Sequence, residues 1–120
     1  MEVPILKQAD ILIATVQAAL TDTDLLQLRS ALVQKVVTTR ARGVIVDLTA
    51  MDVMDSFASR TMREMAQMIR LRGAETVLVG IQPDVALAMV QLGLLLEGIT
   101  TALDLEEGLE YLHRKFESVS

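Results

Sequence analysis

The chain lacks or nearly lacks the residue types on which many catalytic and metal sites depend. Its 120 residues contain no cysteine, which excludes disulfides, thiolate catalysis and cysteine-ligated zinc or iron–sulfur sites. His113 is the single histidine, so a metal site built from several histidines cannot form. The aromatic residues Phe57, Tyr111 and Phe116 are too few for a platform on which nucleic-acid bases could stack. We therefore expect no metal and no cofactor.

Positive charge and long apolar runs are also scarce. Lysine and arginine number 11 against 16 acidic residues, and the formal net charge of −5 has the wrong sign for a surface that binds duplex nucleic acid. The most apolar stretch, 85–96, is interrupted by Gln91 and Gly93 and is shorter than the roughly 20 residues that cross a bilayer. Residues 1–10 show no basic segment followed by an apolar run, as a signal peptide would. We expect a cytoplasmic protein that binds neither nucleic acid nor membrane.

What the chain does have is a regular alternation of apolar segments with turn signals. Hydrophobic residues make up 52% of it, enough for one core in a single domain spanning 1–120. The apolar spacing predicts the order β-β-α-β-α-β-α-β-α. This alternation implies an α/β fold with right-handed crossovers, so we expect a mixed, mostly parallel sheet of four to five strands with about four helices. The predicted strands are 3–7, 11–16, 44–46, 76–79 and 99–102, and the predicted helices are 21–41, 55–72, 83–92 and one that starts near 105.

Two of the predicted helices carry clear apolar stripes. The first helix begins at a cluster of capping residues, 21–24, and is expected to run to about Ala41, with Gly43 as the residue that ends it. The second helix has a polar stripe separate from its apolar one, as expected for a helix with one wet face. The apolar stripe of the first helix is Leu25, Leu28, Leu32 and Val36. The apolar stripe of the second helix is Ala58, Met62, Met65 and Ile69. The polar stripe of the second helix is Ser56, Arg60, Arg63, Gln67 and Arg70.

The loop 49–57 has the clearest chemical signal in the chain. Together with the loops after Val16 and Val79, it is expected at the carboxyl edge of the sheet, where open α/β sheets usually carry their sites. Asp55 and Ser56 open a predicted helix, and residues of these types commonly do no more than cap its backbone N–H groups. A helix N-terminus also stabilises a phosphate, and a phosphorylated Ser56 would add about −1.5 to −2 charges there. Both interpretations stay open on these grounds.

Side chains around Ser56 are candidates for contacts with a partner protein. Two arginines follow it at one and two turns along the polar stripe, and two methionines in the loop offer adaptable apolar surface. A catalytic pair of Ser56 with His113 would need a third, orienting group that we cannot place, and no phosphate-binding glycine motif follows any strand. We expect no catalytic residue, and partner contacts at Met51, Met54, Phe57, Arg60 and Arg63.

Two short motifs resemble those of a known family. Met54-Asp55-Ser56 follows a strand and opens a helix, and Gly80-Ile81-Gln82-Pro83-Asp84-Val85-Ala86 follows the next strand. With the order of the elements, they resemble the STAS family of anti-anti-sigma factors over essentially the whole chain. In that family, the serine directly after the aspartate is phosphorylated by a dedicated protein kinase. The resemblance therefore implies that Ser56 is a phosphorylation site and that Asp55 supports it.

Within this family, the resemblance is to scaffold subunits of the bacterial stressosome. The motif continues as Phe57-Ala58-Ser59, where sporulation-type antagonists have another serine and glycine-rich residues, and Ala86-Leu87-Ala88-Met89 stands where larger paralogues carry a phosphorylated threonine. The resemblance implies a protein that is not an enzyme and that joins RsbR-like STAS paralogues in a large complex. It implies that the complex sequesters an RsbT-like serine kinase until serine phosphorylation releases it, and that an RsbX-like phosphatase resets the system. In isolation, a homodimer is expected.

Two other functions remain open on the sequence. An anti-anti-sigma factor would bind an anti-sigma factor kinase directly, and co-purification with a sensory paralogue in a very large particle would separate the scaffold from it. A small phosphate-ester enzyme or nucleotide binder would use the same helix N-terminus. Turnover that disappears when Ser56 is changed would reveal such an activity.

Overall fold

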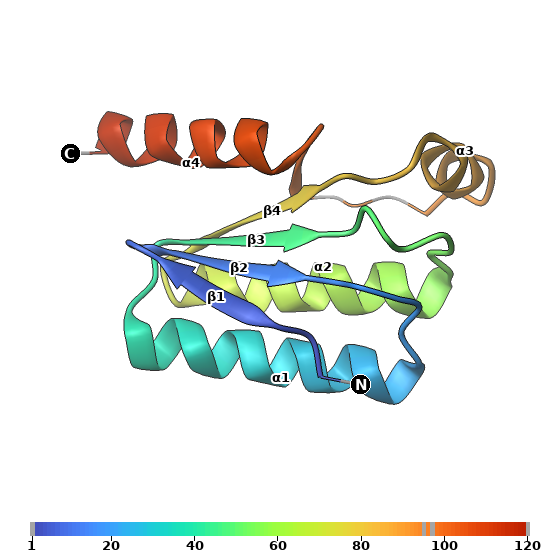
Figure 1. The fold of residues 1–120 in the computed structure, drawn as a ribbon, viewed down its shortest axis with the longest axis horizontal. Helices are drawn as coiled ribbons and strands as arrows, with labels where there is room; N and C mark the ends of the chain where they lie inside the picture. Colours follow the sequence, from blue (N-terminus) through green and yellow to red (C-terminus); the bar gives the residue numbers. More distant parts are fainter. Residues whose placement is uncertain (1, 95, 97, 120) are drawn as a thin grey trace.

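The computed structural model describes residues 2–94, 96 and 98–119, which form an α/β fold. In this part of the chain, five strands make one sheet in the order β1-β2-β3-β4-β5, with four helices packed around it (Figure 1). β1 runs antiparallel to β2 and the remaining neighbours are parallel, so the predicted mixed sheet is confirmed. The strands are β1 (Ile5–Gln8), β2 (Ile11–Thr15), β3 (Gly43–Asp47), β4 (Glu75–Val79) and β5 (Thr100–Ala102), and the helices are α1 (Asp22–Thr39), α2 (Ser56–Leu71), α3 (Pro83–Gln91) and α4 (Leu105–Val119).

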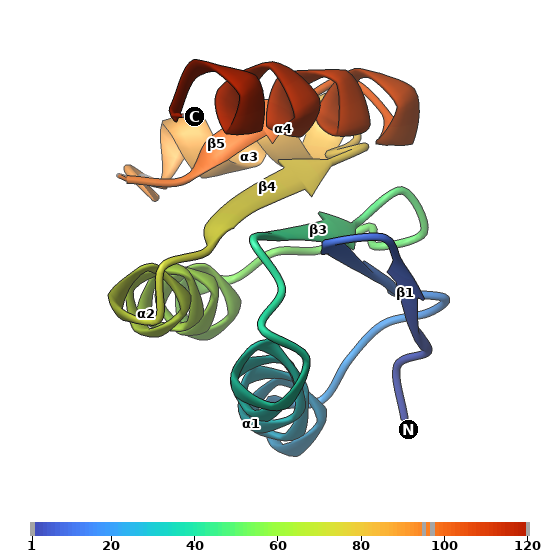
Figure 2. The ribbon, with the colours of Figure 1, turned by 90° about the vertical axis from the view of Figure 1, so that its left-hand side faces the viewer.

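The helices are divided between the two faces of the sheet. α1 and α2 cover one face and α4 the other, while α3 lies beyond the carboxyl end of β4 (Figure 1, Figure 2). The larger apolar core includes the predicted apolar stripes of α1 and α2, all of whose residues are buried, so both stripes are confirmed. A smaller core lies under α4, where Leu112 joins Ile45 and Val77 of the sheet. No helix in the described residues is long and apolar enough to cross a membrane.

The end of α1 differs from the prediction. The helix stops at Thr39, and Arg40 follows it in the left-handed conformation with a φ of 56°. Gly43, which was predicted to end the helix, is instead the first residue of β3. A Cβ at Gly43 would lie 2.8 Å from Leu112 Cδ1, so the glycine is needed for the close approach of α4 to the sheet. The sequence alone did not show whether this glycine ends a helix or leaves room for the side chain of a helix packed on the sheet.

The parallel strands bring three loops to one edge of the sheet, as predicted. The ladder continues to the ends of β2, β3 and β4, because the Val16 N–H donates to Asp47 O at 3.0 Å and the Leu48 N–H donates to Val79 O at 2.9 Å. The loops that follow β3 and β4 lead into α2 and α3, whose N-termini lie at this end of the molecule (Figure 1). The candidate site is therefore on rigid elements at the carboxyl edge.

Candidate functional site

The β3–α2 loop is held in place by polar contacts at its start. Asp47 Oδ1 accepts hydrogen bonds from the Thr49 N–H at 3.0 Å and from Thr49 Oγ1 at 2.6 Å. The carbonyl oxygen of Thr49 in turn accepts from Gln82 Nε2 at 2.7 Å, which ties this loop to the β4–α3 loop. This role of Gln82 could not be predicted from the sequence, because nothing in a single glutamine indicates a partner 33 positions away. The two loops therefore form one connected edge beside the start of α2.

Asp55 caps helix α2. Its backbone is extended, and its Oδ1 accepts a hydrogen bond from the Ala58 N–H at 2.8 Å. Its carbonyl oxygen accepts the first bond of the helix, from the Ser59 N–H at 3.0 Å. From the sequence, Asp55 supports Ser56 either by capping the helix or by orienting the Ser56 hydroxyl toward the nucleotide of a kinase. The geometry shows the capping contact. Ser56 is the first residue of α2 and is exposed to solvent.

We expect Asp55→Ala to lower the free energy of unfolding by about 0.5–2 kcal/mol, the usual cost of losing a side-chain cap. Asp55→Asn keeps an oxygen acceptor at the same position and should lose less. Urea denaturation of the variants measures the difference. Asp52→Ala removes an exposed carboxylate of the same loop and should change the free energy by no more than about 0.5 kcal/mol. An equal loss in Asp52→Ala and Asp55→Ala would show that the cap contact is not the cause.

The two loop methionines are not surface contacts, and this part of the prediction is wrong. Met51 is 4% exposed and Met54 is 5% exposed, and both belong to the larger apolar core. The loop folds back over the end of that core, so the side chains of Met51 and Met54 are buried and do not form a surface for a partner. Phe57 is half-buried and packs against the same core. Val53 is a large apolar side chain of the loop that is exposed, at 69%, and its exposure was not predicted from the sequence.

Two of the three arginines of the polar stripe, Arg60 and Arg63, line a hollow next to Ser56. Arg60 is exposed and Arg63 is half-buried. The hollow has a volume of about 210 Å³, and besides these two residues it is lined by Ser56 and Ser59 of α2 and by residues 93–94, which follow α3. The structure therefore brings together Ser56, Arg60 and Arg63 of the predicted set. Ser59 is an additional lining residue that the sequence did not indicate as part of a site.

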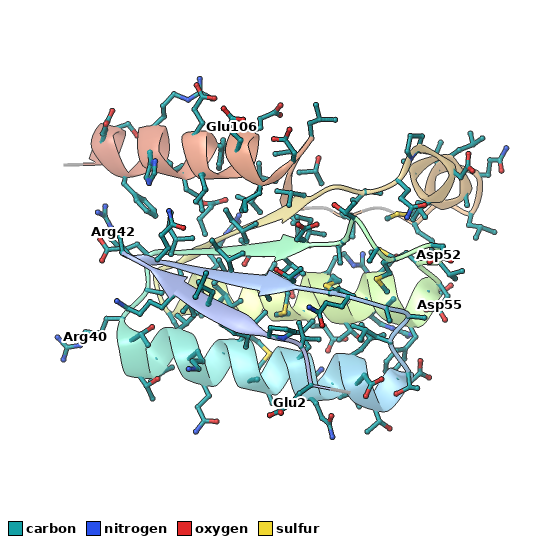
Figure 3. The ribbon with its side chains drawn as sticks, viewed as in Figure 1. Glu2, Arg40, Arg42, Asp52, Asp55 and Glu106 are labelled. Atoms are coloured by element: carbon teal, nitrogen blue, oxygen red, sulfur yellow. The ribbon has the colours of Figure 1, made fainter. Side chains whose placement is uncertain are left out.

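Charge is distributed unevenly along the long axis of the molecule. The exposed Asp52 and Asp55 lie at the end that carries Ser56, while Arg40 and Arg42 lie at the opposite end (Figure 3). Asp84, in the first turn of α3, is also exposed. The end of the molecule that exposes Ser56 therefore carries several carboxylates. The positive side chains of Arg60 and Arg63 lie one and two turns further along α2. A phosphate there would add negative charge to an already negative end.

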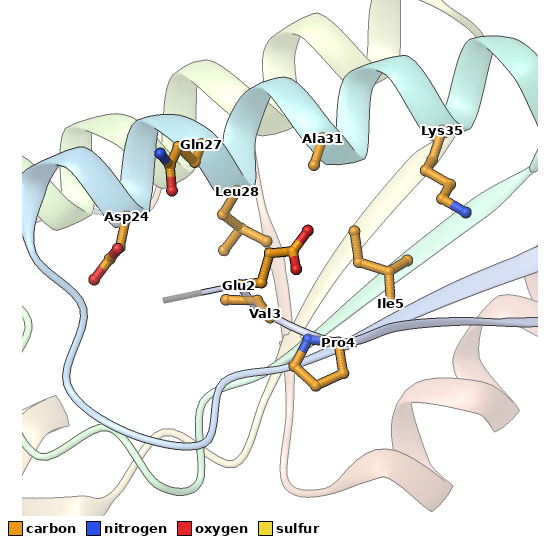
Figure 4. A pocket seen from close by; sticks show the side chains of 9 residues that line it. All are labelled: Glu2, Val3, Pro4, Ile5, Asp24, Gln27, Leu28, Ala31 and Lys35. Atoms are coloured by element: carbon orange, nitrogen blue, oxygen red, sulfur yellow. The ribbon is translucent and has the colours of Figure 1, made fainter.

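Other features of the described residues lie apart from this site. A second hollow, of about 450 Å³, lies between residues 2–5 and helix α1 (Figure 4). Its lining mixes the carboxylates of Glu2 and Asp24 with the apolar Leu28 and the ammonium of Lys35, and it does not include Ser56. His113 is exposed on α4, on the other face of the sheet from α2. Within the described ranges, no three histidine, aspartate or glutamate side chains gather as metal ligands.

Comparison with known proteins identifies what the chain is similar to. The family model described as STAS domain matches residues 2–108. A structure of an RsbS variant from Moorella thermoacetica superposes with a TM-score of 0.83, at 32% identity over 98% of this chain and 99% of that one. A chain in a structure of the molecular architecture of the stressosome gives a TM-score of 0.73, at 32% identity over 94% of this chain and 98% of that one. The expected resemblance to the STAS family, and within it to RsbS, is confirmed by these matches.

A curated relative is longer than this chain. The RsbT co-antagonist protein RsbRA of Bacillus subtilis is 32% identical over 79 residues, which are 66% of this chain and 29% of that protein. The chain therefore spans less than a third of the length of RsbRA.

Proposed function

Since this chain belongs to the STAS domain family, we propose that it is a phosphorylatable scaffold subunit of a bacterial stressosome. In this role, it assembles with RsbR-like STAS paralogues and binds an RsbT-like serine kinase while Ser56 is unmodified. The likeness to RsbS and to a stressosome chain, each at 32% identity over more than nine-tenths of this chain, supports this role over that of an anti-sigma antagonist that acts alone. The protein acts by binding, not by catalysis.

The proposed switch is a phosphoryl transfer to Ser56. The kinase moves the γ-phosphoryl group of ATP to Ser56 Oγ, so that a new O–P bond forms, the terminal O–P bond of ATP breaks, ADP leaves and the hydroxyl proton passes to a base of the kinase. The protein phosphorylated on Ser56 then releases the kinase, and an RsbX-like phosphatase restores the Ser56 hydroxyl by hydrolysis of the phosphate ester. The observation that carries this proposal is the exposure of Ser56 as the first residue of a helix whose cap is Asp55.

The proposal is tested by asking which of the two serines near the start of α2, Ser56 or Ser59, accepts the phosphate. With the cognate RsbT-like kinase and ATP, we expect phosphate on Ser56, because Ser59 is only 3% exposed and Thr61, equally buried, donates its hydroxyl to Phe57 O at 2.8 Å. Both serines fall in the tryptic peptide 43–60, so fragment ions between them assign the site by mass spectrometry.

The matched control uses the second serine. Ser56→Ala should abolish the modification, while Ser59→Ala should leave it in place. Phosphate found chiefly on Ser59 or Thr61 would contradict the proposal.

A further inference from the structure

The hollow beside Ser56 contains a buried hydroxyl without a partner. Ser59 is 3% exposed, and its Oγ has no hydrogen-bond partner among the described residues. Leaving a buried donor unsatisfied costs free energy, so such groups in native proteins commonly have a ligand or solvent partner. Ser59 lines the hollow whose rim includes Ser56. A group with acceptor oxygens placed in this hollow would provide the missing partner.

Two cations without ion pairs line the same hollow. Arg60 and Arg63 make no ion pair or hydrogen bond in the described part of the chain, whereas Arg29 pairs with Glu64 at 3.5 Å and Arg70 Nη2 donates to Gly98 O at 3.0 Å. Guanidinium groups are well suited to hold phosphate, because they present several N–H donors in one plane. The hollow therefore combines positive charge with an unsatisfied donor.

The helical spacing directs these groups toward Ser56. Side chains three and four positions apart lie on one face of a helix, and seven positions complete nearly two turns, so Ser59, Arg60 and Arg63 share a face with Ser56. Side chains on a helix lean toward its N-terminus, so both arginines extend back toward Ser56. The free N–H groups and the dipole at the start of α2 add to the attraction for an anion. At about 210 Å³, the hollow is several times the roughly 30 Å³ share of one water molecule.

We propose that this hollow is the receptor for the phosphoryl group of phosphorylated Ser56, held by Arg60, Arg63 and the hydroxyl of Ser59. The inference rests on the proposed function, since it assumes that Ser56 is the residue that is modified. It explains how phosphorylation could act as a switch, because the phosphate binds Arg60 and Arg63, which in the unmodified protein are available to a partner. Phosphorylation then changes the partner surface without unfolding α2.

The test uses protein in which phosphoserine is incorporated at position 56 during translation, so no kinase is involved. We expect ³¹P NMR titration to give a second phosphate pKa at least about one unit lower than in the same phosphoprotein carrying Arg60→Gln and Arg63→Gln, because nearby cations favour the dianion. The control pair Arg70→Gln and Arg72→Gln removes two charges from the other end of α2, outside the hollow. It should shift the pKa by less than half as much. Equal pKa values with and without Arg60 and Arg63 would overturn the proposal.

Ser59→Ala provides a second, independent readout. In the unmodified protein, we expect this change to leave the melting temperature equal or raise it, because it removes an unsatisfied buried hydroxyl. In the phosphoprotein, we expect it to lower the melting temperature and raise the phosphate pKa. The same effect of Ser59→Ala on both forms would contradict the contact.

A titration of the unmodified protein with inorganic phosphate separates a receptor for phosphorylated Ser56 from a site for free phosphate. The proposal predicts no saturable shift of amide signals at millimolar phosphate, and tight binding would show that the hollow serves a free ligand instead. Failure of kinase labelling at Ser56 would refute the proposed function but leave these measurements unchanged. The two proposals therefore fail separately.

Discussion

Phosphorylation of Ser56 should weaken binding of the RsbT-like kinase by about tenfold or more, which corresponds to about 1.4 kcal/mol. The modification adds about −1.5 to −2 charges to a surface that already carries the exposed carboxylates of Asp52 and Asp55. It also adds a strongly hydrated group to the helix start that follows the loop in which Val53 is exposed. Both changes disfavour a desolvated contact with a partner.

Two variants of Ser56 separate charge from the loss of the hydroxyl. Ser56→Ala should bind the kinase as the unmodified protein does and should keep it bound when ATP is added, because the uncharged loop remains a complete surface. Ser56→Asp should weaken binding only in part, since its carboxylate carries one charge and reaches less far than a phosphate. Strong loss of binding in Ser56→Ala would show that the kinase depends on the hydroxyl itself.

Gly80→Ala should lower the free energy of unfolding by about 2–4 kcal/mol, combining backbone strain with overpacking. Gly80 has a φ of +74°, which favours glycine, and a Cβ there would collide with Thr49 Oγ1 and lie 3.2 Å from Asp47 Oδ1. These are the groups that hold the start of the β3–α2 loop, so relief of the collision displaces the loop that leads to Ser56. Urea denaturation measures the loss of stability.

Gly73→Ala is the matched control for this prediction. Gly73 also has a positive φ, +85°, but a Cβ at this residue would have no neighbouring atom within 4 Å, so only the backbone strain of about 1–2 kcal/mol is expected. Thr49→Ala in the Gly80→Ala background should recover part of the loss, because it removes the colliding oxygen. A Gly80→Ala variant no less stable than Gly73→Ala would contradict the collision.

The architecture could be predicted because it depends on local patterns. The stripe of Leu25, Leu28, Leu32 and Val36 has helical spacing and is buried as expected, and the continuous apolar run 44–46 became a central strand. The role predicted for Gly43, ending a first helix that runs to about Ala41, was wrong, because the role of that glycine depends on the side chain of Leu112 in a distant helix.

The site could be predicted only where neighbours in sequence decide it. Asp55 and Ser56 open a helix, and the cap contact spans three residues, so the pattern was sufficient. Met51 and Met54 were misplaced because their burial depends on how an irregular loop folds over the core, which no periodicity records. The hollow at Ser59 was missed for a similar reason, since its far wall is formed by residues 93–94 after another helix.

The most direct test of the central claim is a paired binding titration. The RsbT-like kinase is titrated with unmodified protein and with protein fully phosphorylated on Ser56, and the melting temperature of both forms is measured in parallel. The account predicts a dissociation constant at least about tenfold higher for the phosphorylated form and a melting temperature that is no lower, because a helix N-terminus accommodates a dianion. Equal dissociation constants would contradict the account by removing Ser56 as the switch, and a large fall in melting temperature with loss of helix would show that release works by unfolding.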